Sequence, residues 1–137
     1  MGESLAGLFV VDTLLEQPAL FDDYIAVSPS LWWDAGRVSA EAAAKLAAQG
    51  ASNRRLYFTV GDEGGTMRDG VEAFRSAVEV NADRFAKWVF VDKSATETHA
   101  TIYHAAALEA LRLFYALPPW EGETPWWMTP DGGPPES

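Results

Sequence analysis

Four residues of this chain have the types that a nucleophilic hydrolase uses, and they occur in the order serine, acid, histidine. Ser4 lies in Gly2–Gly7, a cluster of small residues at the start of the chain. Asp62 and Glu63 follow one apolar segment, and His99 follows a later one. A histidine can accept the proton of a serine hydroxyl, and a carboxylate bonded to it fixes its tautomer. These residue types therefore predict acyl chemistry through a serine nucleophile.

The surroundings of Ser4 suit a sharp turn from strand to helix. Small neighbours permit a turn that exposes the hydroxyl, and the apolar stretch that follows has helical spacing. The N-terminus of such a helix favours developing negative charge, so the Leu5 N–H is a candidate oxyanion donor. The alternative is that Ser4 only caps the helix, because serine is favoured at that position.

The elements that must position these residues alternate between helix and strand. Helices are expected at 5–17, 39–50, 68–84 and 102–117, and strands at 24–27, 56–60 and 87–92. The strands are continuous apolar runs, which is typical of parallel strands covered on both faces. We predict an α/β fold with a mostly parallel three-stranded sheet flanked by helices. The serine, the acids and the histidine would then meet at the carboxyl edge of the sheet.

Local patterns predict which faces are buried and where elements end. The first helix is expected to turn one face inward, made of Leu5, Leu8, Phe9, Leu14 and Leu15. Residues 31–38 are expected to form a loop, with Ser39 capping the next helix and Gly50 ending it. The helix at 68–84 should bury Val71, Phe74, Val78 and Phe85. His104 opens the last helix, and we interpret it as structural.

Composition narrows the function further. The 137 residues suffice for one domain, which we place at 1–117. A Pro-, Gly- and Trp-rich tail follows at 118–137, and its tryptophans are expected to pack it against a surface. A net charge of −10 argues against nucleic acid and anionic membranes as partners. Without cysteine there is no disulfide or thiolate metal site, and we expect no metal and no cofactor. No signal peptide or membrane span is visible, so a cytoplasmic location is expected.

Four motifs in order resemble an esterase family of the α/β-hydrolase superfamily, the one that includes the siderophore (enterobactin-type) esterases and relatives of esterase D. They are the elbow Gly2–Phe9, the segment Ser28–Trp33, the loop Gly61–Gly64 and the Glu97–His99 motif. The resemblance covers about residues 2–117. Ala6 stands where the family often has glycine, and it is small enough to keep the turn.

The resemblance implies a serine carboxylic-ester hydrolase in which Ser4 is the nucleophile and His99 the base. Glu63 is the first choice for the acid and Asp62 the second. Some siderophore esterases are described as using a Ser-His dyad, so the resemblance determines the acid less than the serine and the histidine. Asp34, in the segment 31–38 that is expected to be a loop, and Glu97 are minor alternatives. The substrate is a siderophore ester or a short-chain acyl ester, and acyl transfer to another acceptor is a third interpretation.

The structural alternatives for these residues stay open from the sequence. His99 lies in a polar loop and could be merely exposed, and the acids of the Gly61–Gly64 loop could be ordinary solvated turn residues. Trp32 and Trp33 could simply pack in the fold. The resemblance offers the alternative that they line a pocket for an acyl or aryl group of the substrate, because the family has these residues near its active site.

One departure from the family concerns the strand that should lead into Ser4. Only three residues precede Ser4, so we interpret the chain as the C-terminal half of such an esterase, without the earlier strands and the loop that gives a second oxyanion N–H. Loss of one oxyanion donor typically costs about 10²–10³ in rate. The strand at 24–27 would be an open edge, which predicts a homo-oligomer. The alternative function is a catalytically silent half-domain that self-associates or binds a partner.

Overall fold

Every strand of the sheet runs parallel to its neighbours, in the order β1-β2-β3-β4. The structure, a computed structural model, describes residues 1–118 and Gly122. The strands are β1 (Gly2–Glu3), β2 (Asp23–Val27), β3 (Arg55–Val60) and β4 (Lys87–Asp92). A helix lies in each connection between successive strands, so the predicted α/β architecture with a parallel sheet is confirmed.

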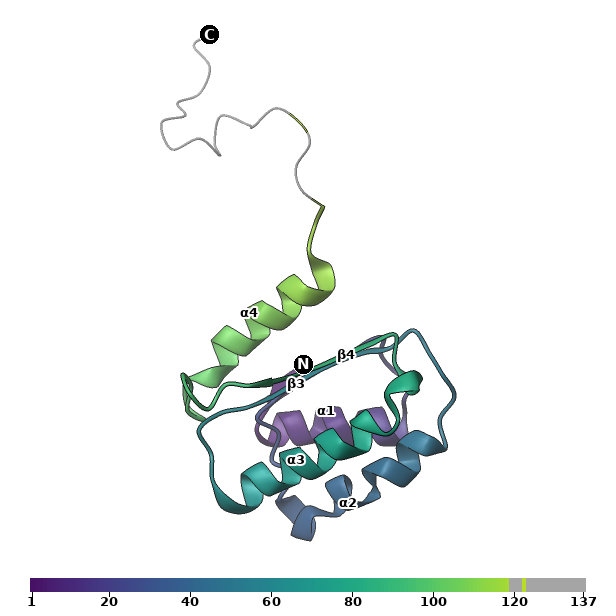
Figure 1. Cartoon of the computed structure of the whole chain (residues 1–137), viewed down its shortest axis with the longest axis horizontal. Helices are drawn as coiled ribbons and strands as arrows, with labels where there is room; N and C mark the ends of the chain where they lie inside the picture. The colour runs from purple at the N-terminus through teal and green to yellow at the C-terminus, as the bar shows by residue number, and fades with distance from the viewer. Residues whose placement is uncertain (119–121, 123–137) are drawn as a thin grey trace.

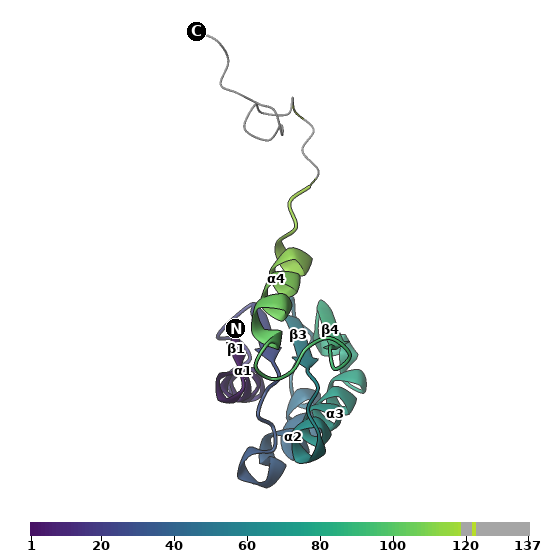
Figure 2. The same cartoon turned by 90° about the vertical axis from the view of Figure 1, so that its left-hand side faces the viewer.

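The helices lie on opposite sides of the sheet. Their bounds are α1 (Leu5–Glu16), α2 (Trp33–Ala47), α3 (Gly65–Glu79), the short 3₁₀ helix η1 (Ala82–Arg84) and α4 (Ile102–Tyr115). Figures 1 and 2 show α1, α2 and α3 along one face and α4 alone on the other. Side chains alternate along the strands to match: Leu56 and Phe58 enter the cluster under α1–α3, whereas Ile25 and Tyr57 enter the cluster under α4.

Helix α1 buries a different face from the predicted one. Leu14 and Leu15 are buried as expected, but Leu5 is 54% exposed and Phe9 is 66% exposed. The residues that pack inward are Gly7, Val10, Val11, Thr13, Leu14 and Leu15. Because this helix carries apolar residues almost all round, spacing alone could not select the buried face. The close approach of Gly7 to Pro29 selects it in the fold.

Helix α2 begins at Trp33, inside the segment that was expected to be a loop. Asp34, Ala35 and Gly36 have positive φ values of 51°, 52° and 75°, so a left-handed turn interrupts the helix after its first residue. Ser39 therefore lies within the helix and does not cap it. Its hydroxyl instead donates to the carbonyl of Gly70 at 3.0 Å, which ties α2 to α3. Propensity indicated the Ala-rich helix correctly but not the turn that precedes it.

Both edges of the sheet differ from the sequence prediction. The residues before Ser4 form the two-residue strand β1, which pairs Gly2 with Ala26 and Glu3 with Val27. The sheet thus has four strands rather than three, and β2 is an open edge only over its first residues. At the other edge, β4 is half-buried rather than buried, because no strand of the described residues pairs with its outer side.

Helix α3 runs over Gly65–Glu79 and is followed by η1, where the sequence predicted one helix over 68–84. The four apolar residues predicted to face inward from this segment are all buried. The predicted tail at 118–137 lies, apart from Pro118 and Gly122, outside the described residues, as does the proposed packing of its tryptophans. Within the described part of the chain, no helix is long and apolar enough to cross a membrane.

An ion pair fastens the end of α4 to the sheet. Arg55 donates to both carboxylate oxygens of Asp23, at 2.5 and 2.6 Å, and to the carbonyl of Phe114 at 2.7 Å. The Tyr115 hydroxyl donates to the same carboxylate. These hydrogen bonds, the one from Arg55 first, hold the pKa of Asp23 below its ordinary value. These contacts hold α4, and with it the loop that precedes α4, against the strands.

Candidate active site

Ser4 occupies a strained turn between β1 and α1. It is the single residue between Glu3, which ends the strand, and Leu5, which begins the helix, and its φ of 57° and ψ of −120° are unusual for a residue with a side chain. The backbone N–H of Ser4 donates to the carbonyl of Val27 at 3.0 Å, and no side-chain hydrogen bond caps the helix. Such strain persists only where neighbours enforce it and concentrates at functional sites. The capping alternative for Ser4 therefore does not describe its geometry.

Glycine at position 2 makes the turn sterically feasible. A Cβ added to Gly2 would lie 2.4 Å from the carbonyl oxygen of Ala6, far inside contact distance. Ala6 itself is accommodated, as expected from its size. The tight turn leaves the N–H groups of the first helical residues, beginning with Leu5, without partners inside the helix. The Leu5 N–H thus stands at the positive end of the α1 dipole, directly after Ser4.

Glu63 and His99 form a hydrogen-bonded pair at the same edge of the sheet. Glu63 Oε1 lies 2.6 Å from His99 Nδ1, and the Glu63 side chain is only 6% exposed whereas that of His99 is 41% exposed. The second Glu63 oxygen is buried without a hydrogen-bond partner among the described residues. Because Nδ1 is engaged by the carboxylate, the second ring nitrogen of His99 is the one available for proton transfer.

The pair exists because the loops after β3 and β4 continue the sheet. Asp62 forms a parallel bridge with Thr98, and its N–H donates to the carbonyl of Glu97 at 2.7 Å. A Cβ on Gly61 would lie 3.1 Å from that same carbonyl oxygen, so glycine permits the close approach. This pairing brings the residue after Asp62 beside the residue after Thr98, which are the acid and the histidine.

The other candidate acids have different surroundings. Asp34 forms an ion pair with Arg37 at 2.9 Å on the surface of α2. Asp62 is one of the carboxylates, after Asp92, that raise the pKa of Arg68. The structure thus brings His99 together with the first-choice acid of the sequence analysis and not with Asp62, and Glu97 contributes backbone groups to the loop pairing.

The Ser4 hydroxyl has a partner that sequence reasoning did not single out. Its Oγ lies 3.1 Å from the Oγ of Ser30, and in the described part of the chain it is not hydrogen-bonded to His99. Hydrogen bonds of catalytic groups are often long in the absence of substrate and tighten in the complex. The clue that the sequence offered was the Ser28–Trp33 motif, whose two serines, Ser28 and Ser30, had no assigned role.

Trp32 and Trp33 are partly exposed, at 42% and 52%, and contact one another edge to face with ring centroids 5.8 Å apart. Trp32 lines a cavity of about 510 Å³ between the N-terminal halves of α2 and α3, to which Thr66 and Gly70 of α3 also contribute. Trp32, which is partly exposed beside this cavity, is not packed in the core. His104, in contrast, is exposed on α4 and packs edge to face on Tyr103.

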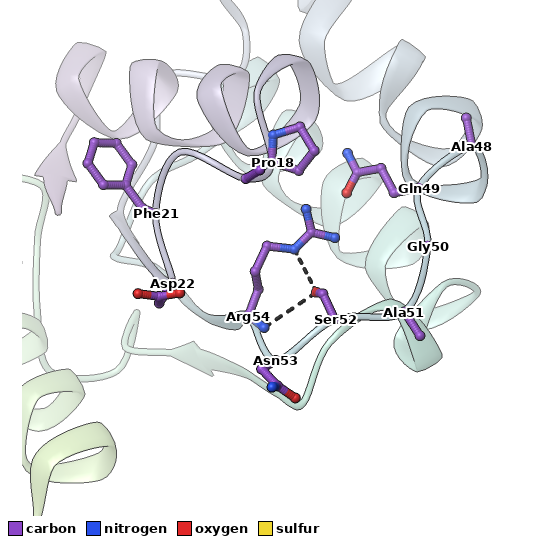
Figure 3. A pocket seen from close by; sticks show the side chains of 11 residues that line it. Pro18, Phe21, Asp22, Ala48, Gln49, Gly50, Ala51, Ser52, Asn53 and Arg54 are labelled. Carbon is purple, nitrogen blue, oxygen red and sulfur yellow. Dashed lines mark hydrogen bonds between the residues drawn. The ribbon is translucent and has the colours of Figure 1, made fainter.

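A larger cavity, of about 610 Å³, lies at the opposite end of the strands and is remote from this chemistry. It is bounded by the ends of α1 and α2 and the start of β3, as Figure 3 shows. Arg54 enters it and donates through Nε to the Ser52 hydroxyl at 2.7 Å. Its charge offsets the partial negative charge of the two helix ends. In the residues that the structure describes, no group of three or more potential metal ligands is present.

The chain is similar to known esterases over part of its length. Over 41 residues the chain is 44% identical to a siderophore enterobactin esterase of Emericella nidulans, a match that covers 30% of this chain and 14% of that protein. The siderophore hydrolase EstB from Aspergillus nidulans superposes with a TM-score of 0.64 at 26% identity, over 85% of this chain and 49% of its own. The chain resembles esterases of the α/β-hydrolase type over part of their length.

A solved bacterial structure agrees in fold. The IroE-like serine hydrolase from Shewanella oneidensis superposes with a TM-score of 0.73 at 19% identity, over 83% of this chain and 38% of its own. The chain spans less than half the length of each of these three proteins. No family model matches it. The expected resemblance to this esterase family is therefore confirmed for part of a chain.

Proposed function

We propose that this chain carries the nucleophile, base and acid of a serine carboxylic-ester hydrolase. The observation that carries the proposal is the 2.6 Å hydrogen bond between buried Glu63 and His99, at the sheet edge where Ser4 sits in a strained turn. A carboxylate-oriented histidine and an exposed-turn serine form the arrangement that acyl transfer requires. The similarity to siderophore esterases supports the same chemistry.

The proposed reaction runs through an acyl-enzyme. Ser4 Oγ attacks the ester carbonyl while its proton passes to His99, and Glu63 stabilises the imidazolium that forms. The N–H of Leu5 donates to the developing oxyanion. The bond to the alcohol then breaks, and His99 protonates the departing alkoxide. Water repeats the sequence on the acyl group and regenerates Ser4.

The substrate is proposed to be a siderophore ester or a short-chain acyl ester. The cavity that Trp32 lines is proposed to hold its acyl or aryl group, because the Trp32 ring is partly exposed there, and Trp33 contacts that ring. Aromatic walls of this kind hold apolar groups without fixing one substrate. The reaction needs no cofactor, since every proton is carried by a named side chain.

The direct test of the proposal is a covalent label. A fluorophosphonate reacts with a serine only where a base and an oxyanion site activate the hydroxyl, so we expect one adduct per chain, on the peptide that contains Ser4. Intact-mass and peptide-mapping mass spectrometry measure it, and the Ser4→Ala chain is the control. No adduct, or an adduct on another serine, would contradict the assignment.

A second proposal concerns self-association, and a specific surface favours it. Exposed apolar side chains gather at the first residue of the chain, on α1 and on the loop after it, namely Met1, Leu5, Phe9, Leu20 and Phe21. Three of them line a groove of about 280 Å³ that reaches the start of β2. Beside it, Asp23–Ile25 of β2 lie beyond the two-residue pairing with β1, which leaves sheet edge open. We propose that a second copy of the chain covers this surface.

Phe9→Glu is expected to shift the chain from dimer to monomer, because it places a charge at the centre of the apolar surface. Size-exclusion chromatography with light scattering measures the change, and higher salt should favour the dimer by screening the net charge of −10 per chain. The control is Val80→Glu at the end of α3, since Val80 is 76% exposed outside the groove. A chain that is monomeric before any substitution would refute self-association.

A further inference from the structure

Ser30 forms two separate hydrogen bonds with Ser4. Its backbone N–H donates to the Ser4 carbonyl at 3.0 Å, and the two hydroxyl oxygens lie 3.1 Å apart. The Ser30 side chain is nearly inaccessible, with the residue 2% exposed. A buried hydroxyl whose side-chain partner is the proposed nucleophile is well placed to influence the chemistry of that nucleophile.

The segment that carries Ser30 is fixed on both flanks. Pro29 lies so close to Gly7 that a Cβ added to Gly7 would lie 3.0 Å from the Pro29 Cα. Ser28, with a φ of 39°, accepts the Gly61 N–H on its Oγ at 3.1 Å. The Ser28–Pro29–Ser30 segment therefore connects the nucleophile turn to the loop that begins the acid side of the site, and it cannot shift without disturbing both.

We propose that Ser30 is a positioning residue whose hydroxyl donates to Ser4 Oγ. This inference rests on the proposed function of Ser4. A donor on the nucleophile oxygen leaves the Ser4 proton free to be given to His99, and it stabilises negative charge as that proton departs. Ser30 keeps its own proton throughout, and the bond that forms to the carbonyl carbon comes from the remaining lone pair of Ser4. The hydroxyl thus orients the attack and adds to the stabilisation by Leu5.

Ser30→Ala removes the hydroxyl and keeps the backbone hydrogen bond. We expect kcat for p-nitrophenyl acetate to fall about 10- to 100-fold, as loss of one hydrogen bond to a developing charge implies. KM should stay within about twofold, because the contact is to the nucleophile and not to the ester. Ser30→Thr, which restores the hydroxyl, should recover most of kcat. The pH midpoint of the rate should not move, since the pair of His99 and Glu63 is unchanged.

The control is Ser52→Ala, which removes a hydrogen-bonded serine hydroxyl at the far end of the strands (Figure 3). It is expected to lower the midpoint of thermal unfolding without changing kcat. If the threonine does not fit, thermal unfolding supplies a second measurement. Ser4→Ala and Ser30→Ala should each lower the midpoint. The double variant should lower it by less than the sum of the two shifts, because both substitutions remove the same hydroxyl–hydroxyl contact.

The outcomes separate the two proposals. Unchanged kcat in Ser30→Ala, or additive shifts in the unfolding midpoint, would overturn the positioning role while leaving Ser4 as nucleophile. A loss of kcat accompanied by an equal loss in Ser52→Ala would also overturn it, because a general loss of stability would then explain both. If the unaltered chain shows no hydrolysis that depends on Ser4, the proposed function fails and the role of Ser30 fails with it.

Discussion

Glu63→Gln is expected to lower kcat by on the order of 10⁴-fold while the fold stays intact. The amide keeps the size of the carboxyl group but carries no charge. It no longer stabilises the imidazolium, and its NH₂ favours the wrong tautomer of His99. Steady-state hydrolysis of p-nitrophenyl butyrate measures the loss, and circular dichroism reports the fold. Because Glu63 is only 6% exposed and bonded to His99 at 2.6 Å, water cannot readily substitute for it.

The neighbouring carboxylate provides the matched control. Asp62→Asn makes the same change of charge one residue away, at a side chain that is not hydrogen-bonded to His99 in the structure. We expect its kcat to stay within about threefold of the unaltered chain, as for a surface charge. Equal losses in both variants would mean that the acid is not Glu63 alone. Little loss in either would indicate a dyad of Ser4 and His99.

Phe58→Ala is expected to lower the free energy of unfolding by about 3–5 kcal/mol. Phe58 is fully buried in the middle of β3, and its ring centroid lies 5.1 Å from that of Phe74 and 5.0 Å from that of Phe90. Removing the ring opens a cavity between the sheet and α3 and breaks two aromatic contacts. Since a small domain has only about 5–15 kcal/mol in total, this loss removes a large share of its stability.

Phe9→Ala makes the matched comparison on α1, where Phe9 is 66% exposed. Urea unfolding followed by tryptophan fluorescence, at a protein concentration that holds both variants in the same oligomeric state, should show a change of less than about 0.5 kcal/mol for this variant. Similar losses in the two variants would mean that α1 buries Phe9, as the helical spacing had predicted, and that the described packing of this helix is incorrect.

The sequence predicted the layers of this fold because its strands are continuous apolar runs separated by helix patterns. It could not predict the buried face of α1. This helix has apolar residues on nearly all sides, Leu5 and Phe9 among them, so the spacing of apolar residues does not distinguish the buried face from the exposed one. It could not predict β1 either, because two residues are too few to show a strand pattern. Asp34 and Ala35 adopt positive φ, which propensity does not anticipate for such residues.

The candidate site was predictable where chain order and motif spacing carry information. Ser4, Glu63 and His99 follow separate strands, and parallel strands end at one edge of the sheet. The family resemblance ranked Glu63 above Asp62, but residue types and spacing alone could not, because the pairing with His99 depends on the register between the loops after β3 and β4, which the bridge of Asp62 to Thr98 sets. The contact of Ser30 with Ser4 likewise arises from tertiary packing across β1 and β2.

The measurement that tests the central claim most directly is hydrolysis of p-nitrophenyl acetate and butyrate by the chain and by its Ser4→Ala variant, with the oligomeric size determined on the same samples. Ser76→Ala, an exposed serine of α3, serves as the control. We predict turnover that falls by on the order of 10³-fold or more in Ser4→Ala and stays unchanged in the control. Equal rates in all three would contradict the assignment of Ser4 as a nucleophile and favour a chain that only binds a partner.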